Sequence, residues 1–448
     1  MAHKFTKDTI ITTITNILIL VISIGTSIII ARFLGPRGKG LYTLAFLFPT
    51  FLITFTNIGI GPATVYYIGK KKYSIQEIFG VNIIFSFLIS LFSLILAFLI
   101  LLFFSQQLFP NVPKNYLFFS IFSIPIQVLF TFIIEIFLGL QKIKKYNFIF
   151  LLQSFLFFIF IFCFLTLMHQ GVKMTIFSTI FSYFLTLIFL IYQTKKEIGS
   201  PVFSFNKNII KDFLQYGAKC YISNILGFLH YRVDQFMINF FLNPTAVGIY
   251  SIAVGISEKL WLIPQSAATV LFPRVSSEKD KKKLKEFTPI VCRNVFFITI
   301  FSCLILFLMG KWIILFLYSE KFLKSVSSFQ FLLIGAVTFS ASKILSSDIA
   351  GRGKPEINTY IGIFSVLLNI ILNAIFIPKI GIVGAAWATA ISYSFNFFSL
   401  LIIYAKISGN KIKDVVLIKK NDIEYYKKFI SLVLSRVKIK KYGEKRIN

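Results

Sequence analysis

The chain is 448 residues long, and its composition excludes a set of soluble domains. Hydrophobic residues make up 56% of it, charged residues only 14%, and phenylalanine alone contributes 56 residues. Apolar runs of about 20 residues or more recur along the chain, which is the length needed to cross a bilayer core. Runs such as 79–104 are apolar on every side, whereas membrane β-strands alternate apolar and polar positions. The sequence therefore predicts an all-α polytopic membrane protein.

The charge of the chain is strongly positive, with 47 lysines and arginines against 17 acids and a formal net charge of +30. Such a balance often indicates a nucleic-acid partner. Here the cations lie in the short loops between apolar runs and in the C-terminal tail, so we exclude nucleic acid. The four cysteines form no CxxC pair and have no histidine cluster beside them, which argues against a metal site or a disulfide framework.

Charge clusters, prolines and glycines divide the chain into about twelve candidate spanning helices. The expected helix cores are 10–33, 41–68, 78–104, 116–138, 148–168, 174–192, 213–241, 249–272, 289–309, 329–349, 357–377 and 383–404. The first run is longer than the apolar core of a signal peptide and no small-residue cleavage site follows it, so we expect a retained span.

The loop cations fix the expected orientation. The loops on the side of the N-terminus hold more than twice as many lysines and arginines as the loops on the other side, which include Arg37, Lys39 and Lys173. By the positive-inside rule, both termini are predicted to be cytoplasmic. The basic tail, residues 406–448, either forms an amphipathic helix on anionic lipid or stays a solvated segment.

The two halves of the chain resemble each other at an offset of about 210 residues, a sign of internal duplication. Leucine, proline, glycine, tyrosine and alanine recur in the same order at two places, Leu34, Pro36, Gly40, Tyr42 and Ala45, and Leu242, Pro244, Gly248, Tyr250 and Ala253. We therefore predict two six-helix lobes, residues 1–200 with the start of a linker and residues 201–405. Because each lobe has an even number of spans, their axis runs along the membrane normal.

Two lobes with a site between them are typical of alternating-access transporters. A membrane enzyme usually carries a large loop with paired carboxylates, but Glu320 is the only acid in the predicted outer loops. No catalytic residue and no cofactor is therefore expected.

Short motifs in both halves resemble one protein family. The segments that carry the resemblance are Arg32-Phe-Leu-Gly-Pro36, Gly40-Leu-Tyr42, Asn57-Ile-Gly59, Arg232-Val-Asp-Gln235, Val247-Gly-Ile-Tyr250, Pro264, Phe272-Pro273 and Gly381-Ile-Val-Gly384. Together they resemble the Wzx-type polysaccharide and oligosaccharide flippases, over residues 6–404. This is a branch of the exporter superfamily that also contains multidrug extruders and the lipid II flippase. The resemblance implies translocation of a polyprenyl-diphosphate-linked oligosaccharide from the inner to the outer leaflet.

Five cations lie inside predicted spans, Lys219, Arg232, Lys259, Arg293 and Lys343. An ionisable group at the bilayer centre costs about 2.5–3.5 kcal/mol, so each is a functional candidate. A guanidinium suits bidentate phosphate contact, and a lysine acts as a point charge. Arg293 is so close to its helix start that we expect it to snorkel to the interface. The other four are predicted to contact the diphosphate.

Helix geometry pairs some of these cations with acids. Folding the hairpin near residue 245 brings Arg232 level with Glu258, and Asp234 close to Lys259. The four residues are then either a structural ion-pair network or part of the substrate cavity, and both readings stay open.

Lys219 and Lys343 have no acid one helical turn away, so they are the better candidates for free cations, although Lys219 is close enough to the cytoplasmic end to snorkel there. Arg32 is added to the candidate cations by the family resemblance, although it lies at the outer edge of its span. Asn16 and Asn57 are predicted polar contacts for sugars, or alternatively helix-packing hydrogen bonders.

Glu135 and Asp348 occupy similar places near the cytoplasmic ends of spans four and ten. Ion pairs with Lys142 and Lys354 are one interpretation. A coupling site for H⁺ or Na⁺ is the other.

These observations lead to one functional prediction and its rivals. We predict a flippase in the bacterial cytoplasmic membrane that serves cell-surface polysaccharide synthesis, such as that of O-antigen and lipopolysaccharide. Its partners are the lipid-linked glycan, membrane lipids and other polysaccharide-assembly proteins. A multidrug extruder of the same superfamily is the main alternative, followed by a membrane glycosyltransferase or polymerase and a non-transporting scaffold.

Overall fold

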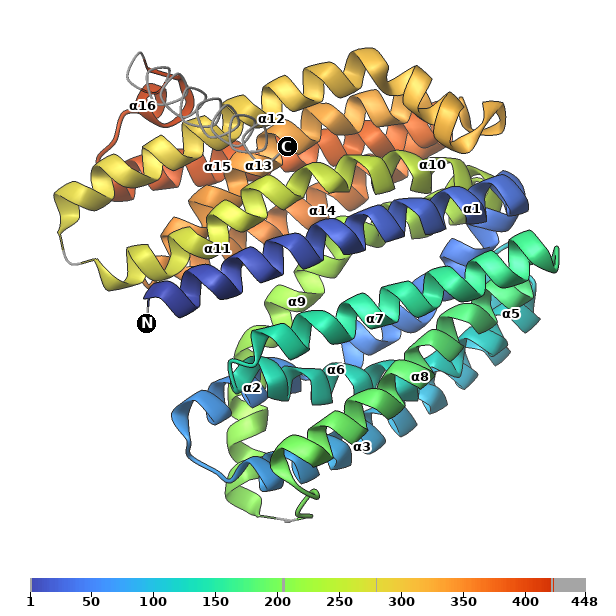
Figure 1. The fold of residues 1–448 in the computed structure, drawn as a ribbon. Coiled ribbons are helices and arrows are strands. Elements are labelled where there is room, and N and C mark those ends of the chain that lie inside the picture. The colour runs from blue at the N-terminus through green and yellow to red at the C-terminus, as the bar shows by residue number, and fades with distance from the viewer. Residues whose placement is uncertain (1, 204–205, 279, 420–421, 423–448) are drawn as a thin grey trace, which may run out of the picture. The chain divides into compact units, whose positions relative to one another are not determined.

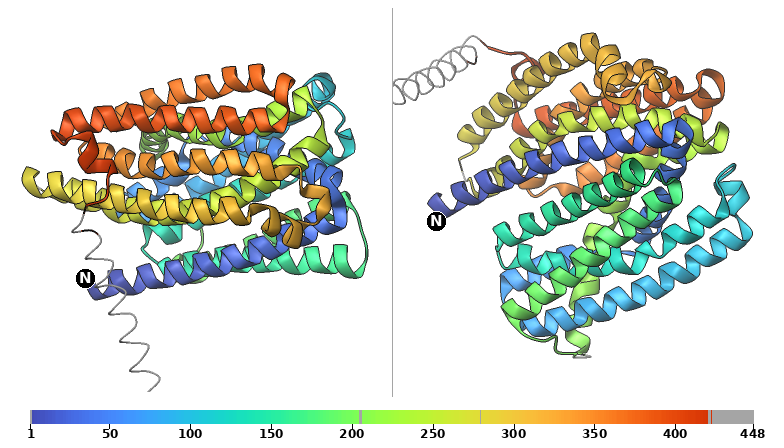
Figure 2. Two further views of the ribbon diagram at one scale, coloured as in Figure 1. Left: turned by 90° about the horizontal axis from the view of Figure 1, so that it is seen from above. Right: turned by 45° about the vertical axis from the view of Figure 1, so that its right-hand side comes forward.

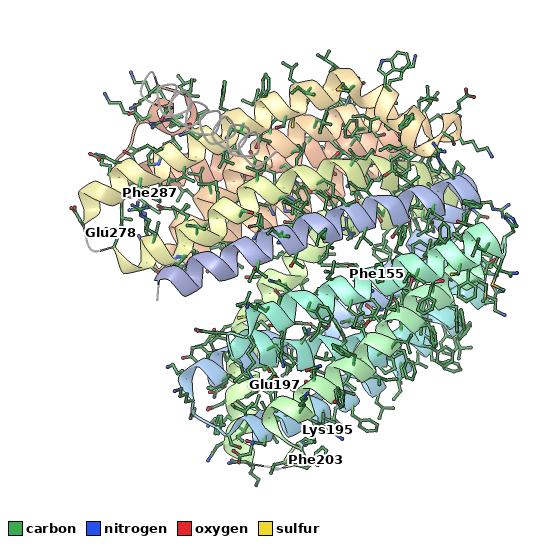
Figure 3. All side chains as sticks on the ribbon, viewed as in Figure 1. Phe155, Lys195, Glu197, Phe203, Glu278 and Phe287 are labelled. Atoms are coloured by element: carbon green, nitrogen blue, oxygen red, sulfur yellow. The ribbon has the colours of Figure 1, made fainter. Side chains whose placement is uncertain are left out.

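A computed structural model describes residues 2–203, 206–278, 280–419 and 422 (Figure 1). Within these ranges all regular secondary structure is helical, which confirms the predicted all-α class. Ten helical segments of the described chain are long and apolar enough to cross a membrane. Many large apolar side chains are exposed, such as Phe155 on α7 (labelled in Figure 3), which is 49% exposed.

The helices follow one another with short connections. The first half contains α1 (Ala2–Thr56), α2 (Ile60–Lys70), α3 (Ile75–Phe103), α4 (Ser105–Leu108), α5 (Lys114–Ile121), α6 (Ser123–Gly139), α7 (Ile143–Ile161) and α8 (Val172–Ile198). The second half contains α9 (Lys207–Phe241), α10 (Pro244–Ser257), α11 (Leu262–Ser277), α12 (Lys281–Tyr318), α13 (Ser325–Gly351), α14 (Pro355–Ile380), α15 (Ile382–Ser408) and α16 (Ile412–Val416). A π-helical segment, Phe162–Leu167, extends α7.

The predicted spans correspond to these helices with two local differences. Spans one and two are joined in α1, which bends at Gly35, whose φ of 65° is one that L side chains rarely adopt. The second span is interrupted at 57–59, where Gly59 has a φ of 74°. The seventh span, α9, is 35 residues long but carries too many polar residues to count among the ten apolar segments. Dividing α1 at Gly35 and adding α9 gives one helix for each predicted span.

The described chain divides into two compact units by its contacts. The first contains residues 1–256, 309–331 and 366–389, and the second contains residues 257–308, 332–365 and 390–448. The division does not follow chain order, because α12, α13, α14 and α15 each contribute one end to the first unit. The predicted six-helix lobes therefore stay a prediction. The surface helix predicted beyond residue 422 lies outside the described residues.

Polar side chains tie the helices of the first unit together. Asn82 of α3 accepts a hydrogen bond from the Thr64 hydroxyl of α2 at 2.9 Å and donates one to the Phe132 carbonyl of α6, also at 2.9 Å. Asn147 of α7 donates to the Thr12 hydroxyl of α1 at 2.8 Å. Helices α3, α6, α7 and α8 run alongside one another (Figures 1 and 2). In a membrane such bonds fix helix neighbours because lipid offers no competing partner.

The second unit has its own apolar core. Leu271, Leu345, Phe397 and Tyr404 are buried together where parts of α11, α13 and α15 meet. The Ser347 hydroxyl donates to the Ala268 carbonyl at 2.8 Å and joins α13 to α11.

Two glycines of the repeated motif touch in the first unit. A Cβ atom on Gly40 would lie 1.7 Å from the carbonyl oxygen of Pro244, and one on Gly248 would lie 1.9 Å from that of Pro36. At both positions the crossing of α1 and α10 has no room for a side chain larger than the hydrogen atom of glycine, as at other close helix crossings between small residues. The segments that match in sequence are the segments that meet in space.

We expect Gly40→Ala and Gly248→Ala to lower stability by about 1–3 kcal/mol each, because the added methyl group forces two backbones apart. Gly255→Ala, on α10 with open space around its Cβ position, is the matched control and should be neutral or slightly stabilising. Thermal unfolding of the purified protein in detergent measures all three. Equal melting temperatures for Gly248→Ala and Gly255→Ala would contradict the close crossing.

Candidate functional site

The charged residues of α9 lie in the first unit. Asp234 is only 5% exposed, and its carboxylate accepts hydrogen bonds from the Tyr250 hydroxyl at 2.6 Å and from the Gln235 amide at 2.7 Å. Tyr250 belongs to the repeated motif, so this contact links the motif to the charged segment. Arg232 is half-buried and donates to the Tyr231 carbonyl at 3.0 Å.

The predicted pairs Arg232 with Glu258 and Asp234 with Lys259 join residues of different units. They stay predictions. The structure adds Tyr250 as a hydrogen-bond partner of Asp234, which the sequence analysis missed. The recurrence of this tyrosine in the repeated motif was the one signal in the sequence that could have indicated its role.

Lys219 is exposed in the N-terminal part of α9, twelve residues after the helix begins. Among the described residues its ammonium group makes no hydrogen bond or ion pair, and its place in the site stays a prediction. Gln215 and Ser223, four residues to either side, are also exposed, so the same helix face is polar over about two turns.

The second unit gathers Glu258, Lys259 and Lys343 around a break between two helices. Residues Glu258–Trp261 form a 3₁₀ turn that separates α10 from α11. Lys343 of α13 donates to the Gln265 side chain at 2.9 Å and lies 5.1 Å from the centroid of the Trp261 ring. The Glu258 carboxylate acts electrostatically on Lys343 as well as on Lys259.

This arrangement corrects the view of Lys343 as a free cation. Its ammonium group is held by an amide oxygen and an aromatic face, within the field of one acid. A cation held this way is preorganised for an anion, because its side chain is already ordered.

Asp348 and Glu135 have surroundings different from those predicted. Asp348 is fully buried and pairs with Arg352, the residue directly after the end of α13, instead of with Lys354. It also accepts a hydrogen bond from the Thr288 hydroxyl at 2.5 Å. The sequence analysis paired it with the wrong cation because Arg352, four residues after Asp348, directly follows the last turn of α13, whereas Lys354 lies beyond the turn at Gly353.

Glu135 does not pair with Lys142. Both Lys142 and Lys145 bind Glu197 at the end of α8, where Lys195 also lies (Figure 3). Glu135 is half-buried beside Gly61, and in the described part of the chain its carboxylate makes no hydrogen bond or ion pair.

Of three further predicted site residues, two have structural partners in this conformation. Arg32 donates to the Leu317 carbonyl at 2.8 Å and to that of Phe316, so it caps the C-terminal end of α12, where a cation is favoured. Asn57 accepts from the Gly59 amide at 3.1 Å and thereby closes the break between α1 and α2. Asn16 is exposed on α1.

Arg293 does not snorkel, contrary to the prediction. It is 6% exposed and forms a two-pronged ion pair with Asp422, which is 1% exposed, at 2.5 Å and 2.8 Å. The residue that holds it comes from the C-terminal tail, too far along the chain for helical spacing to reveal it. The Lys419 amide completes the site by donating to Asp422 at 2.9 Å.

The Asp422 carboxyl is tuned by two opposing effects. Burial by itself would raise its pKa, but the Arg293 guanidinium and the Lys419 amide outweigh burial and hold the pKa below the usual 3.8. The stabilisation from this pair is therefore fully present above pH 3.8 and is lost as the pH falls through the lower folded-state pKa.

We expect Arg293→Met to lower stability by about 3–5 kcal/mol, because it leaves Asp422 buried without its cation. The difference from wild type should be larger at pH 8 than at pH 5, because without the guanidinium burial raises the pKa of Asp422 and a protonated carboxyl is less costly to bury than an ionised one. Lys406→Met, at an exposed position of the same unit, should have almost no effect. Melting curves over this pH range provide the measurement, and a similar loss in both variants would contradict a specific pair.

Solved structures of membrane transporters have a similar fold. A structure described as lipid II flippase MurJ in an inward closed conformation matches with a TM-score of 0.74 at 19% identity, covering 91% of this chain and 89% of that one. An inward-facing multidrug resistance transporter of the MATE family and MOP superfamily matches with a TM-score of 0.72 at 16% identity, covering 91% and 98%. The chain has the fold of this class of transporters.

Residues 29–327 match the model of a family described as polysaccharide biosynthesis protein, and the chain belongs to that family. This confirms the family resemblance found in the sequence motifs.

Two curated relatives have informative names. The probable low-salt glycan biosynthesis flippase Agl15 of Haloferax volcanii is 26% identical over 239 residues, covering 49% of this chain and 47% of that protein. A putative O-antigen transporter of Shigella flexneri is 24% identical over 229 residues, covering 51% and 55%. The matches span about half the length of these relatives.

Proposed function

We propose that the protein is a membrane transporter, and specifically a flippase for a polyprenyl-diphosphate-linked oligosaccharide. In this proposal it moves the headgroup from the inner to the outer leaflet by alternating access, for cell-surface polysaccharide synthesis. The observation that carries the proposal is the set of intramembrane cations in a chain of this family and fold. Relatives named as a glycan flippase and an O-antigen transporter support it.

The cations have distinct proposed roles. Lys219, exposed in the N-terminal part of α9, receives the diphosphate first. Arg232 supplies the planar guanidinium that binds two phosphate oxygens at once. Lys259 and Lys343 form a second set beside Glu258, whose carboxylate an arriving phosphate would displace as their counter-charge. A competing internal acid keeps binding reversible, which a transporter needs for release.

The acids and amides complete the proposed site. Asp234, Glu258, Glu135 and Asp348 are proposed to act as ion-pair partners or as a coupling site, with Glu135 the best placed for coupling because it lacks an ion pair in the described chain. Asn16 is proposed to contact sugars.

The membrane supplies part of the energy in this proposal. An inside-negative potential favours outward movement of an anion by about 2.3 kcal/mol per charge per 100 mV. A location in the bacterial cytoplasmic membrane with both termini inside is proposed from the loop charges. Other polysaccharide-assembly proteins are proposed partners.

A multidrug extruder is the second candidate, favoured by the likeness to the multidrug transporter fold. Its organic cation substrate would be repelled by Lys219 and Arg232. The charge of the transported group therefore separates the two functions. A glycosyltransferase or polymerase has less support, because the described residues place no pair of acids at a candidate catalytic site.

We expect the purified protein in proteoliposomes to transfer a fluorescent polyprenyl-diphosphate oligosaccharide between leaflets. Lys219→Ala and Arg232→Ala should each lower the transfer rate at least tenfold, because each removes a phosphate contact worth about 1.4 kcal/mol or more. Lys196→Ala removes an exposed lysine at the end of α8 and is the matched control.

An organic cation in the same vesicles is the second arm of the experiment. Transfer of that cation, with no transfer of the lipid-linked glycan, would support the extruder and overturn the flippase. Equal rates for Lys219→Ala and Lys196→Ala would remove Lys219 from the site.

A further inference from the structure

A pocket with several polar residues in its lining lies in the first unit, between α1 and α7. Its volume is 210 Å³. Since about 10–15 Å³ of such space holds one water, the pocket has room for several waters or for one sugar ring. Its polar lining comes from Ser23, Thr26 and Ser27 of α1 and from Gln153 and Ser154 of α7.

One cation faces this pocket. Lys39 follows the Gly35 bend of α1 and lines the pocket together with Tyr42, whose ring centroid lies 5.8 Å from the lysine nitrogen. Within the described residues the Lys39 ammonium group forms no ion pair or hydrogen bond, and the pocket lining contains no acid. The sequence analysis counted Lys39 as a loop cation, because it is so close to the bend between two spans.

The other polar groups of the pocket are available mainly as acceptors. The Thr26 hydroxyl donates to the Ile22 carbonyl of its own helix at 2.8 Å, which leaves its oxygen lone pairs for the pocket. The Gln153 amide nitrogen faces the Ser182 hydroxyl at 3.5 Å, which leaves its carbonyl oxygen. The pocket therefore offers one ammonium group together with acceptor oxygens of Thr26 and Gln153.

A ligand that matches this pattern has one anionic group and several hydroxyl donors. A carboxylate would neutralise Lys39, whose partly buried charge is costly to keep without a counter-ion. Hydroxyl groups would donate to Thr26 and Gln153. The apolar walls, Ile22, Ile30 and Phe157, suit the C–H face of a sugar ring. A simple inorganic anion would leave the acceptors unused, and a neutral sugar would leave the cation unpaired.

We propose that this pocket binds an acidic sugar residue, one that carries a carboxylate, with Lys39 as the residue that selects for the acid. If the proposed flippase function holds, such a residue belongs to the transported glycan, and this part of the inference rests on that function. None of the cations assigned to the diphosphate lines this pocket, so we assign the pocket to the glycan and not to the lipid anchor.

Equilibrium binding to the full-length protein in lipid nanodiscs tests the proposal without transport. The probes are glucuronate, glucose and acetate, which present charge with hydroxyls, hydroxyls alone and charge alone. Saturation-transfer NMR with competition gives the affinities. We expect glucuronate to bind at least tenfold more tightly than glucose or acetate, and Lys39→Met to weaken glucuronate at least tenfold. Lys39→Arg should keep most of the affinity.

Two further variants keep the experiment decisive. Gln153→Leu removes an acceptor without touching the cation and should also weaken glucuronate, which covers the case in which Lys39→Met does not fold. Lys173→Met, at an exposed position on α8, is the matched control and should bind as wild type does.

The outcomes that overturn the proposal are distinct. Acetate binding as tightly as glucuronate would identify a simple anion site. Glucuronate binding that survives both Lys39→Met and Gln153→Leu would place the sugar elsewhere. Absence of glucuronate binding by folded wild type would overturn the pocket assignment, while the flippase proposal would still be decided by the transfer assay alone.

Discussion

Hydrocarbon offers no partner to a peptide group, and this constraint governs the structure. Inside a bilayer the backbone must satisfy its own hydrogen bonds, which is why the described chain is built from helices. Breaks in a spanning helix are then costly and need local compensation. At the break after α1, Asn57 supplies that compensation to the Gly59 amide. At Gly35, the bend uses a backbone conformation open mainly to glycine.

The breaks also position the charged groups. The Gly35 bend places Lys39 over the pocket between α1 and α7, and the 3₁₀ turn at Glu258–Trp261 brings one acid and one indole ring toward Lys343. A continuous helix would place successive side chains around its circumference at fixed angles. An interruption in the helix allows polar groups to lie on one side of it. The two interruptions lie beside Lys39 and Lys343.

The same constraint separates structural charges from available ones. Arg293 is paired with Asp422, and Asp348 is paired with Arg352, and both carboxylates are buried. Such pairs neutralise a charge that would otherwise be costly in the interior. The ammonium groups of Lys219 and Lys39 form no such ion pair within the described residues. Charges of this second kind are the ones that an anionic substrate can use, since binding does not first have to break a strong pair.

Residue periodicity and loop charge were sufficient to predict the helices, because the length of an apolar run and the cost of moving a lysine across a bilayer are local properties. The motif around Gly40 and Gly248 likewise predicted a repeat, and these residues meet in space.

Tertiary structure decided which charges are paired. Arg293 pairs with Asp422, which lies far along the chain. Lys142 pairs with Glu197 and not with Glu135. Lys39 lines a pocket. Sequence spacing reveals partners only within one helix or across one hairpin. An ion pair between distant segments depends on how whole helices pack, and that packing is set by many weak contacts spread over the entire chain.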